Sequence, residues 1–160
     1  MSKNFSELTF DQIEIGLTKK FHVNITQLLV DEFAKISGDF SPIHVDDEFA
    51  KSTKFGRKIV HGMLLASLLS RMVGMYLPGK YALYSSQTLE FHNPCFIGDE
   101  ILVSSVETDK SESTKIIKIE SKITNIKKDI LLYGAGRIIV RDEWKLWCWN
   151  WYFKHKKVQG

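Results

Sequence analysis

The pattern of apolar and polar residues has a helical period in the first half of the chain. Residues 19–25 have strand character, and Thr26 then stands at the N-cap position of a segment whose apolar residues recur at helical spacing as far as Gly38. Asp46 is a second N-cap residue, placed before a short apolar segment. The pattern therefore predicts one helix between Thr26 and Gly38 and a short helix after Asp46.

The most apolar segment runs over residues 61–76 and is broken by Pro78 and Gly79. It is rich in leucine and methionine on nearly every side, which predicts a long buried helix. Along one face, small residues recur at every fourth position, so another backbone or a slender ligand can lie close to that face. These residues are Gly62, Ala66, Ser70 and Gly74.

Beyond this segment the period becomes the two-residue alternation of strands. The candidate strands are residues 81–92, 100–108, 115–125 and 130–141. The fold class we predict is α+β, with an antiparallel sheet wrapped around the long helix. Because a single sheet of this kind has edges that need to be covered, we expect two copies of the chain to pair as at least a dimer.

The composition is that of a soluble globular domain. The chain has 160 residues, of which 44% are hydrophobic and 26% charged, and none of its apolar runs is long enough to span a membrane. The first residues become acidic where a secretory signal would be apolar, so we expect a cytoplasmic protein. Cys95 and Cys148 lie far apart and predict neither a disulfide framework nor a zinc site.

The last seventeen residues differ from the rest of the chain. They contain four lysines, no acidic residue and all four tryptophans; subtracting these four charges from the total of +3 leaves −1 for residues 1–143. We therefore expect a single domain over 1–143, an aromatic and basic tail over 144–160, and no nucleic-acid partner. The tail composition suits covering a subunit surface, touching a membrane interface or stacking on nucleotides, and it also suits an extension with no role.

Candidate chemistry lies in the segment SGDFSPIHVD, which carries Asp39 and His44. Gly38 can end the preceding helix with a positive φ, and Pro42 restricts the backbone around it, so the loop is stiff. A carboxylate and an imidazole on one stiff loop can move protons around one water molecule. From these residues alone a structural alternative stays open, in which Asp39 caps the turn and His44 is a satisfied core residue.

Three segments of the chain resemble a known family: SGDFSPIHVDDEFA, IVHGMLLASLLS and LPGKYALYSSQTLEFHNPCFIGDE. In this order and spacing, over roughly residues 10–141, they resemble the (R)-specific enoyl-CoA hydratases of the MaoC-like dehydratase family. The resemblance implies the hot-dog fold and the reversible syn hydration of trans-2-enoyl-CoA to (R)-3-hydroxyacyl-CoA, without a metal or other cofactor. The family has asparagine before the proline, whereas this chain has Ser41, which changes the hydrogen bonds available to the loop.

The resemblance also implies roles for individual residues. Asp39 and His44 become the catalytic pair, Gly62 the backbone donor to the thioester carbonyl, and Ser70 a polar neighbour in the substrate site. Gly62 suits this role because the first N–H groups of a helix are unpaired and its positive dipole end favours an oxyanion. Which member of the Asp39 and His44 pair takes the proton and which delivers it is not assigned.

Two other functions remain alternatives to the hydratase: a hot-dog acyl-CoA thioesterase and a non-catalytic acyl-CoA-binding module. We expect no metal, because His61 and His92 do not complete a zinc-type spacing with Asp39 and His44. Ser70 is not expected to be a nucleophile, since no Gly-x-Ser-x-Gly turn surrounds it. The basic residues of 54–58 either meet the phosphates of coenzyme A or form a solvated loop. The sequence predicts neither the acyl chain length nor the acyl carrier.

Overall fold

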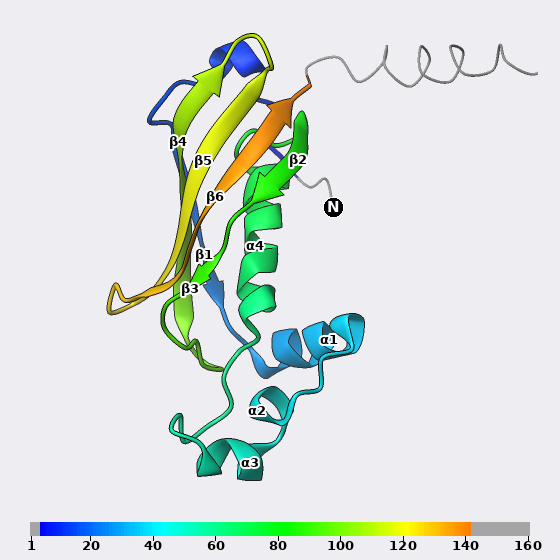
Figure 1. Ribbon diagram of the computed structural model, residues 1–160, viewed down its shortest axis with the longest axis vertical. Helices are drawn as coiled ribbons and strands as arrows, with labels where there is room; N and C mark the ends of the chain where they lie inside the picture. The colour runs from blue at the N-terminus through cyan, green and yellow to red at the C-terminus, as the bar shows by residue number, and fades with distance from the viewer. Residues whose placement is uncertain (1–3, 142–160) are drawn as a thin grey trace, which may run out of the picture.

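The structure is a computed structural model that describes residues 4–141 of the chain (Figure 1). The predicted tail over 144–160 lies outside the described residues, so the domain boundary at 143 remains a prediction. Within residues 4–141, no helix is long and apolar enough to cross a membrane.

One antiparallel sheet of six strands forms the main layer, in the order β1-β4-β5-β6-β2, and β3 also pairs with β6. The strands are β1 (Thr18–Asn24), β2 (Ala82–Gln87), β3 (Glu90–Phe91), β4 (Glu100–Ser111), β5 (Ile116–Asn125) and β6 (Ile130–Val140). The helices are a 3-10 turn η1 (Phe10–Gln12), α1 (Gln27–Ser37), α2 (Pro42–Val45), α3 (Asp47–Ser52) and α4 (Gly62–Met75). Helix α4 lies along one face of the sheet, whereas α1, α2 and α3 form a group beyond the end of the sheet (Figure 1). The α+β prediction is confirmed.

The core lies between α4 and the sheet. One row of paired residues crosses four strands and is buried against the helix: Phe21, Val103, Ile123 and Leu132. The helix contributes residues of its inner face, which are Leu64, Leu65, Leu69, Met72 and Val73. The alternation of apolar and polar residues in the strands thus places one apolar face of the sheet against α4, as the sequence predicts.

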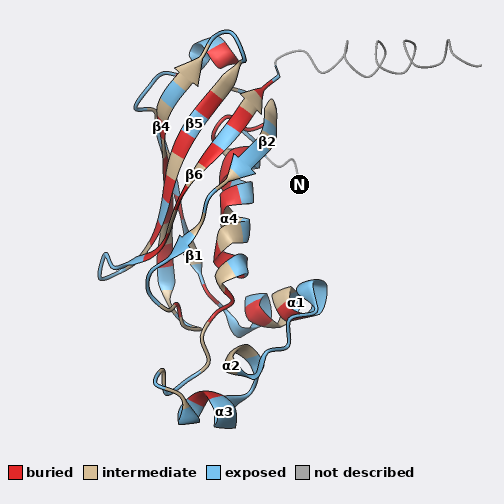
Figure 2. Ribbon diagram, in the orientation of Figure 1, coloured by how far each residue is buried: buried red, intermediate tan, exposed pale blue. Residues whose placement is uncertain are grey.

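The outer face of α4 is not buried by the described residues, although the apolar sequence predicted burial on every side. Figure 2 shows exposed positions along this face, and Met63 is 56% exposed. Ser70 is also exposed. The reason for the difference is that a sheet on one side of a helix covers only that side.

The predicted helix ends are confirmed in atomic detail. The hydroxyl of Thr26 accepts a hydrogen bond from the backbone N–H of Leu29 at 3.2 Å, and Gly38 ends α1 in the left-handed conformation with φ of 73°. The carboxylate of Asp46 accepts hydrogen bonds from two N–H groups at the start of α3. Residues of this kind direct the local fold because they satisfy backbone groups that a helix terminus leaves unpaired.

Two predicted segments differ from the structure. The strand predicted over 81–92 is divided into β2 and β3, because the hydroxyl of Thr88 accepts a hydrogen bond from the N–H of Ala135 and the ladder is interrupted there. The loop after Gly38 contains the short helix α2, which has Pro42 at its first position and carries His44.

Candidate active site

The turn between α1 and α2 presents the side chain of Asp39. Oδ1 of Asp39 accepts a hydrogen bond of 3.1 Å from the N–H of Ser41, which is the Asx-type turn of the structural alternative. The side chain nevertheless remains 50% exposed, so the second oxygen can still meet water or a ligand. Capping the turn and acting on a substrate are therefore compatible for this carboxylate.

The imidazole of His44 is held at its edge by the segment that precedes α4. Nδ1 of His44 lies 2.8 Å from the carbonyl oxygen of Ile59, and the N–H of Ile59 donates to the carbonyl of Ile43. Because a carbonyl only accepts, Nδ1 carries the hydrogen, and in the neutral ring Nε2 is left as the accepting nitrogen. The tautomer thus places an unprotonated nitrogen away from the backbone.

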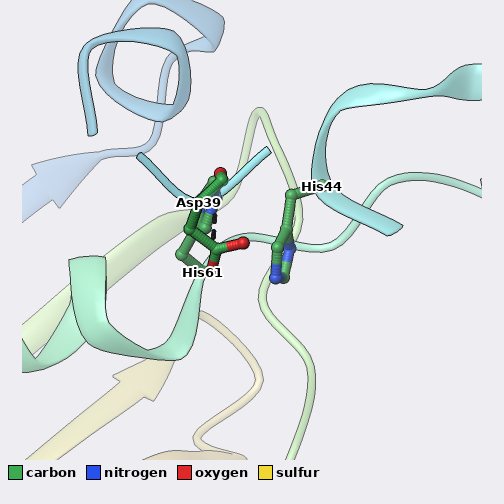
Figure 3. Close-up of side chains that lie close together, drawn as sticks. All are labelled: Asp39, His44 and His61. Carbon is green, nitrogen blue, oxygen red and sulfur yellow. Dashed lines mark hydrogen bonds and ion pairs between the residues drawn. The ribbon is translucent and has the colours of Figure 1, made fainter. Parts of the chain in front are cut away.

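A second histidine, His61, joins this pair. Nε2 of His61 lies 3.0 Å from the backbone carbonyl oxygen of Asp39 and 4.0 Å from its Oδ2. The rings of His44 and His61 are 3.9 Å apart at their centroids and inclined by 30°. Figure 3 shows the three side chains facing one another. The sequence makes His61 a candidate only as a metal ligand, because nothing in its spacing indicates the contact with Asp39.

Gly62 begins α4 immediately after His61. The carbonyl of His61 accepts hydrogen bonds from the N–H groups of Leu64 and Leu65, whereas the first N–H of a helix has no intrahelical acceptor. A Cβ atom on Gly62 would lie only 2.8 Å from the ring of Phe91. The glycine therefore lets an aromatic ring lie close over the start of the helix.

Asp39, His44, His61 and Gly62 all line one cavity of about 570 Å³. The cavity continues over apolar side chains, among them Val60, Leu65, Phe91 and Cys95. Burial raises the pKa of the Cys95 thiol to about 12, so this residue stays protonated and does not serve as a nucleophile. The cavity thus carries a carboxylate, two imidazoles and the first residue of α4 together with apolar side chains.

Ser70 is not among the residues that line this cavity. It lies on the exposed face of α4, about 12 Å along the helix axis from Gly62. The structure therefore brings together three of the four site residues expected from the sequence and leaves Ser70 apart from them.

The other candidates have structural partners. His92 lines the cavity and pairs with Glu90 at 3.4 Å. Among the basic residues of 54–58, Lys54 lines the cavity, Arg57 stacks on the ring of Phe96 at 3.9 Å, and Lys58 pairs with Asp47 at 3.2 Å. Lys54 is therefore the basic residue of this segment best placed to meet a ligand at the mouth of the cavity.

The fold also brings three groups that can hold a metal close together, although their spacing in the sequence gave no sign of it. Ligand atoms of Asp39, His44 and His61 lie within 4.8 Å of one another. However, the two rings contact one another at 3.9 Å between centroids, inclined by 30°. One nitrogen of each ring also donates to a carbonyl group. The arrangement suits hydrogen bonding better than metal ligation.

The family model of the MaoC-like domain matches residues 12–128 of the chain. The chain belongs to the MaoC-like domain family. It is 39% identical over 116 residues to an (R)-specific enoyl-CoA hydratase of Aeromonas caviae, covering 72% of this chain and 87% of the relative. It is 45% identical over 96 residues to a 3-hydroxybutyryl-CoA dehydratase of Methylorubrum extorquens, covering 60% of this chain and 61% of the relative.

A solved structure of an (R)-hydratase from A. caviae involved in PHA biosynthesis superimposes on this MaoC-like domain with a TM-score of 0.78. The two are 36% identical, and the match covers 80% of this chain and 97% of the hydratase. The hot-dog fold that the sequence resemblance implied is thereby confirmed.

Proposed function

We propose that this MaoC-like domain is an (R)-specific enoyl-CoA hydratase that adds water reversibly to trans-2-enoyl-CoA and yields (R)-3-hydroxyacyl-CoA. The observation that carries the proposal is that Asp39, His44 and Gly62, the first residue of α4, all line one cavity, with Nδ1 of His44 bound to the carbonyl of Ile59. The hydratase and the dehydratase named among its relatives support the same reaction class.

The reaction divides between the two parts of the site. Asp39 and His44 hold a water molecule, remove one proton as its oxygen adds to C3, and return one proton to C2 on the same face. Negative charge passes onto the thioester oxygen during this addition, and the N–H of Gly62 donates a hydrogen bond to it. The atoms of one water molecule balance the reaction, so it needs no cofactor.

Ser70 has a more distant role in this proposal. Because it lies about 12 Å along α4 from Gly62 and outside the cavity, it would not meet the thioester. Its exposed position on α4 suits contact with a second copy of the chain.

We further propose that the protein is a cytoplasmic homodimer of a single hydratase domain spanning 1–143, followed by the separate tail over 144–160. The described sheet supports this with an edge at β2, where Leu83 is exposed. Strand β3 pairs with β6 on the same edge of the sheet, and its residue Phe91 is exposed as well. Pairing of two edges would cover both the open strand and these side chains. The charge of −1 over residues 1–143 supports the absence of a nucleic-acid partner.

The test follows the ultraviolet absorbance of crotonyl-CoA with the purified protein and determines the chirality of the product. We expect loss of the enoyl band and formation of the (R)-hydroxy thioester. Asp39→Asn and His44→Ala should each lower kcat by about 100-fold or more, the usual contribution of a general acid or base. Matched controls are Asp47→Asn and His22→Ala, since both residues are exposed and lie outside the cavity.

The same assay separates the alternatives. A thioesterase would release free coenzyme A thiol from acyl-CoA, because its water attacks the carbonyl carbon. A binding module would take up butyryl-CoA saturably and turn over neither crotonyl-CoA nor longer enoyl-CoAs. Either result would overturn the hydratase proposal.

A further inference from the structure

His61 occupies the junction between the two parts of the proposed site, yet the proposed reaction gives it no step. Its backbone carbonyl accepts the first hydrogen bonds of α4, so its main chain belongs to the helix that presents Gly62. Its side chain is 1% exposed and reaches back to Asp39, 22 residues earlier. His61 therefore links Gly62, the proposed backbone donor, to the loop that carries Asp39 and His44.

The hydrogen bond of this side chain is directed at the main chain of Asp39. Because the acceptor is a carbonyl oxygen, 3.0 Å away, Nε2 of His61 carries the hydrogen. The bond holds the backbone of Asp39 and leaves its carboxylate free to act. The other nitrogen, Nδ1, is buried and has no hydrogen-bond partner among the residues of 4–141.

An unpartnered buried nitrogen is a cost to folding that an apolar side chain of similar size would avoid. Histidine offsets this cost because its Nε2–H donates the hydrogen bond to Asp39, which phenylalanine or leucine could not do. The position is therefore built for the hydrogen bond to Asp39 rather than for packing alone.

The ring of His61 also supports His44. Its centroid lies 3.9 Å from that of His44 and 5.1 Å from that of the Phe33 ring. The carbonyl of Ile59 fixes the edge of the His44 ring, and His61 covers its face. Ile59 and His61, from the same segment, thus limit both the tilt and the rotation of the His44 imidazole.

We propose that His61 is a positioning residue, which sets the distance between the N–H of Gly62 and the water held by Asp39 and His44. The inference rests on the proposed hydratase function. The thioester oxygen and C3 of a bound enoyl group have a fixed separation, so donor and water must be held at a matching separation. A misplacement of about 1 Å in such a site can lower the rate by about 100-fold.

Three variants divide the two contacts of His61. His61→Phe keeps an aromatic ring against His44 and removes the N–H donor. His61→Gln keeps an N–H near the position of Nε2 and removes the ring, and His61→Leu removes both. The assay measures kcat on crotonyl-CoA per butyryl-CoA-binding site, so that unfolded protein does not count. Leu69→Ala is the matched control, because Leu69 is a buried residue of the same helix outside the cavity.

We expect His61→Phe and His61→Leu to lose about 10- to 100-fold in kcat per site with KM changed by less than about threefold, as for groups that act on geometry in the transition state. His61→Gln should retain more activity than His61→Leu, and Leu69→Ala should have the wild-type kcat per site. Wild-type kcat per site in His61→Phe, or equal losses in the Gln and Leu variants, would overturn the positioning role. An inactive wild-type protein that binds butyryl-CoA would instead overturn the hydratase proposal, and with it this role.

Discussion

The substitution Gly62→Ala tests the backbone donor without removing it. The added methyl group would lie 2.8 Å from Cε1 of Phe91, which is too close for unshifted atoms. Phe91 can turn aside, because it is 53% exposed and its ring is the far end of a flexible side chain. Alanine also favours a helix over glycine by up to about 1 kcal/mol. We therefore expect the free energy of unfolding to change by less than about 1 kcal/mol.

The effect on catalysis should be much larger than the effect on stability. Complete loss of one oxyanion donor lowers kcat by about 100- to 1000-fold. In Gly62→Ala the N–H remains but the methyl group and the displaced Phe91 ring stand in the cavity, so we expect a loss of about 10- to 100-fold. The measurements are hydration of crotonyl-CoA and denaturant unfolding of the same preparations. The double variant with Phe91→Ala should recover part of the loss. Unchanged kcat in Gly62→Ala would refute the placement of the thioester oxygen at this N–H.

Three further predictions concern single groups. Since the pKa of the Cys95 thiol is raised to about 12, iodoacetamide at pH 7.5 should leave this thiol unmodified in the folded protein. Mass spectrometry of the treated protein measures the modification, and rapid alkylation of Cys95 would contradict its burial. Burial likewise raises the pKa of the Glu107 carboxyl, whose two oxygens have no hydrogen-bond partner among the described residues. The charged carboxylate is therefore disfavoured in the folded state, so stability that is present below the unfolded pKa of Glu107 is lost as the pH rises through its folded pKa. Glu107→Gln removes this titration, and its free energy of unfolding, measured with denaturant, should fall less between pH 4 and pH 8 than that of the wild-type protein. Prolonged treatment with EDTA should leave kcat on crotonyl-CoA unchanged, and restoration of lost activity by zinc would show that Asp39, His44 and His61 hold a metal.

The sequence predicts the local parts of this molecule well because local rules decide them. Thr26, Gly38 and Asp46 mark helix ends, and each does so through contacts within a few residues. The alternation in residues 116–125 likewise fixes which side chains of β5 face the core. Such signals depend on a residue and its neighbours in the chain, so one sequence is enough to find them.

Contacts between distant segments could not be predicted in the same way. The bond from His61 to Asp39 spans 22 residues, and no periodic pattern connects them. The exposed face of α4 was also missed, because an apolar helix looks equally suited to burial on every side. Ser70 shows the same limit: the resemblance placed it in the substrate site, whereas the structure places it on this exposed face, away from the cavity.

The segment immediately before α4 explains how a site outside the main sheet can be well ordered. Asp39 and His44 belong to the group of helices beyond the end of the sheet (Figure 1), yet their loop is tied to residues that lead directly into the core helix. Ile59 contributes two hydrogen bonds to α2, and His61 contributes one to Asp39.

Substitution of Asp39 and substitution of His44 affect these three hydrogen bonds differently. Asp39→Asn changes only the side chain and leaves the backbone carbonyl that His61 binds, so its effect reports on proton transfer alone. His44→Ala removes one of the bonds to Ile59 together with the imidazole. A kcat for Asp39→Asn that falls as far as that of His44→Ala, at unchanged butyryl-CoA affinity, would therefore place the loss in the chemistry and not in the order of the loop.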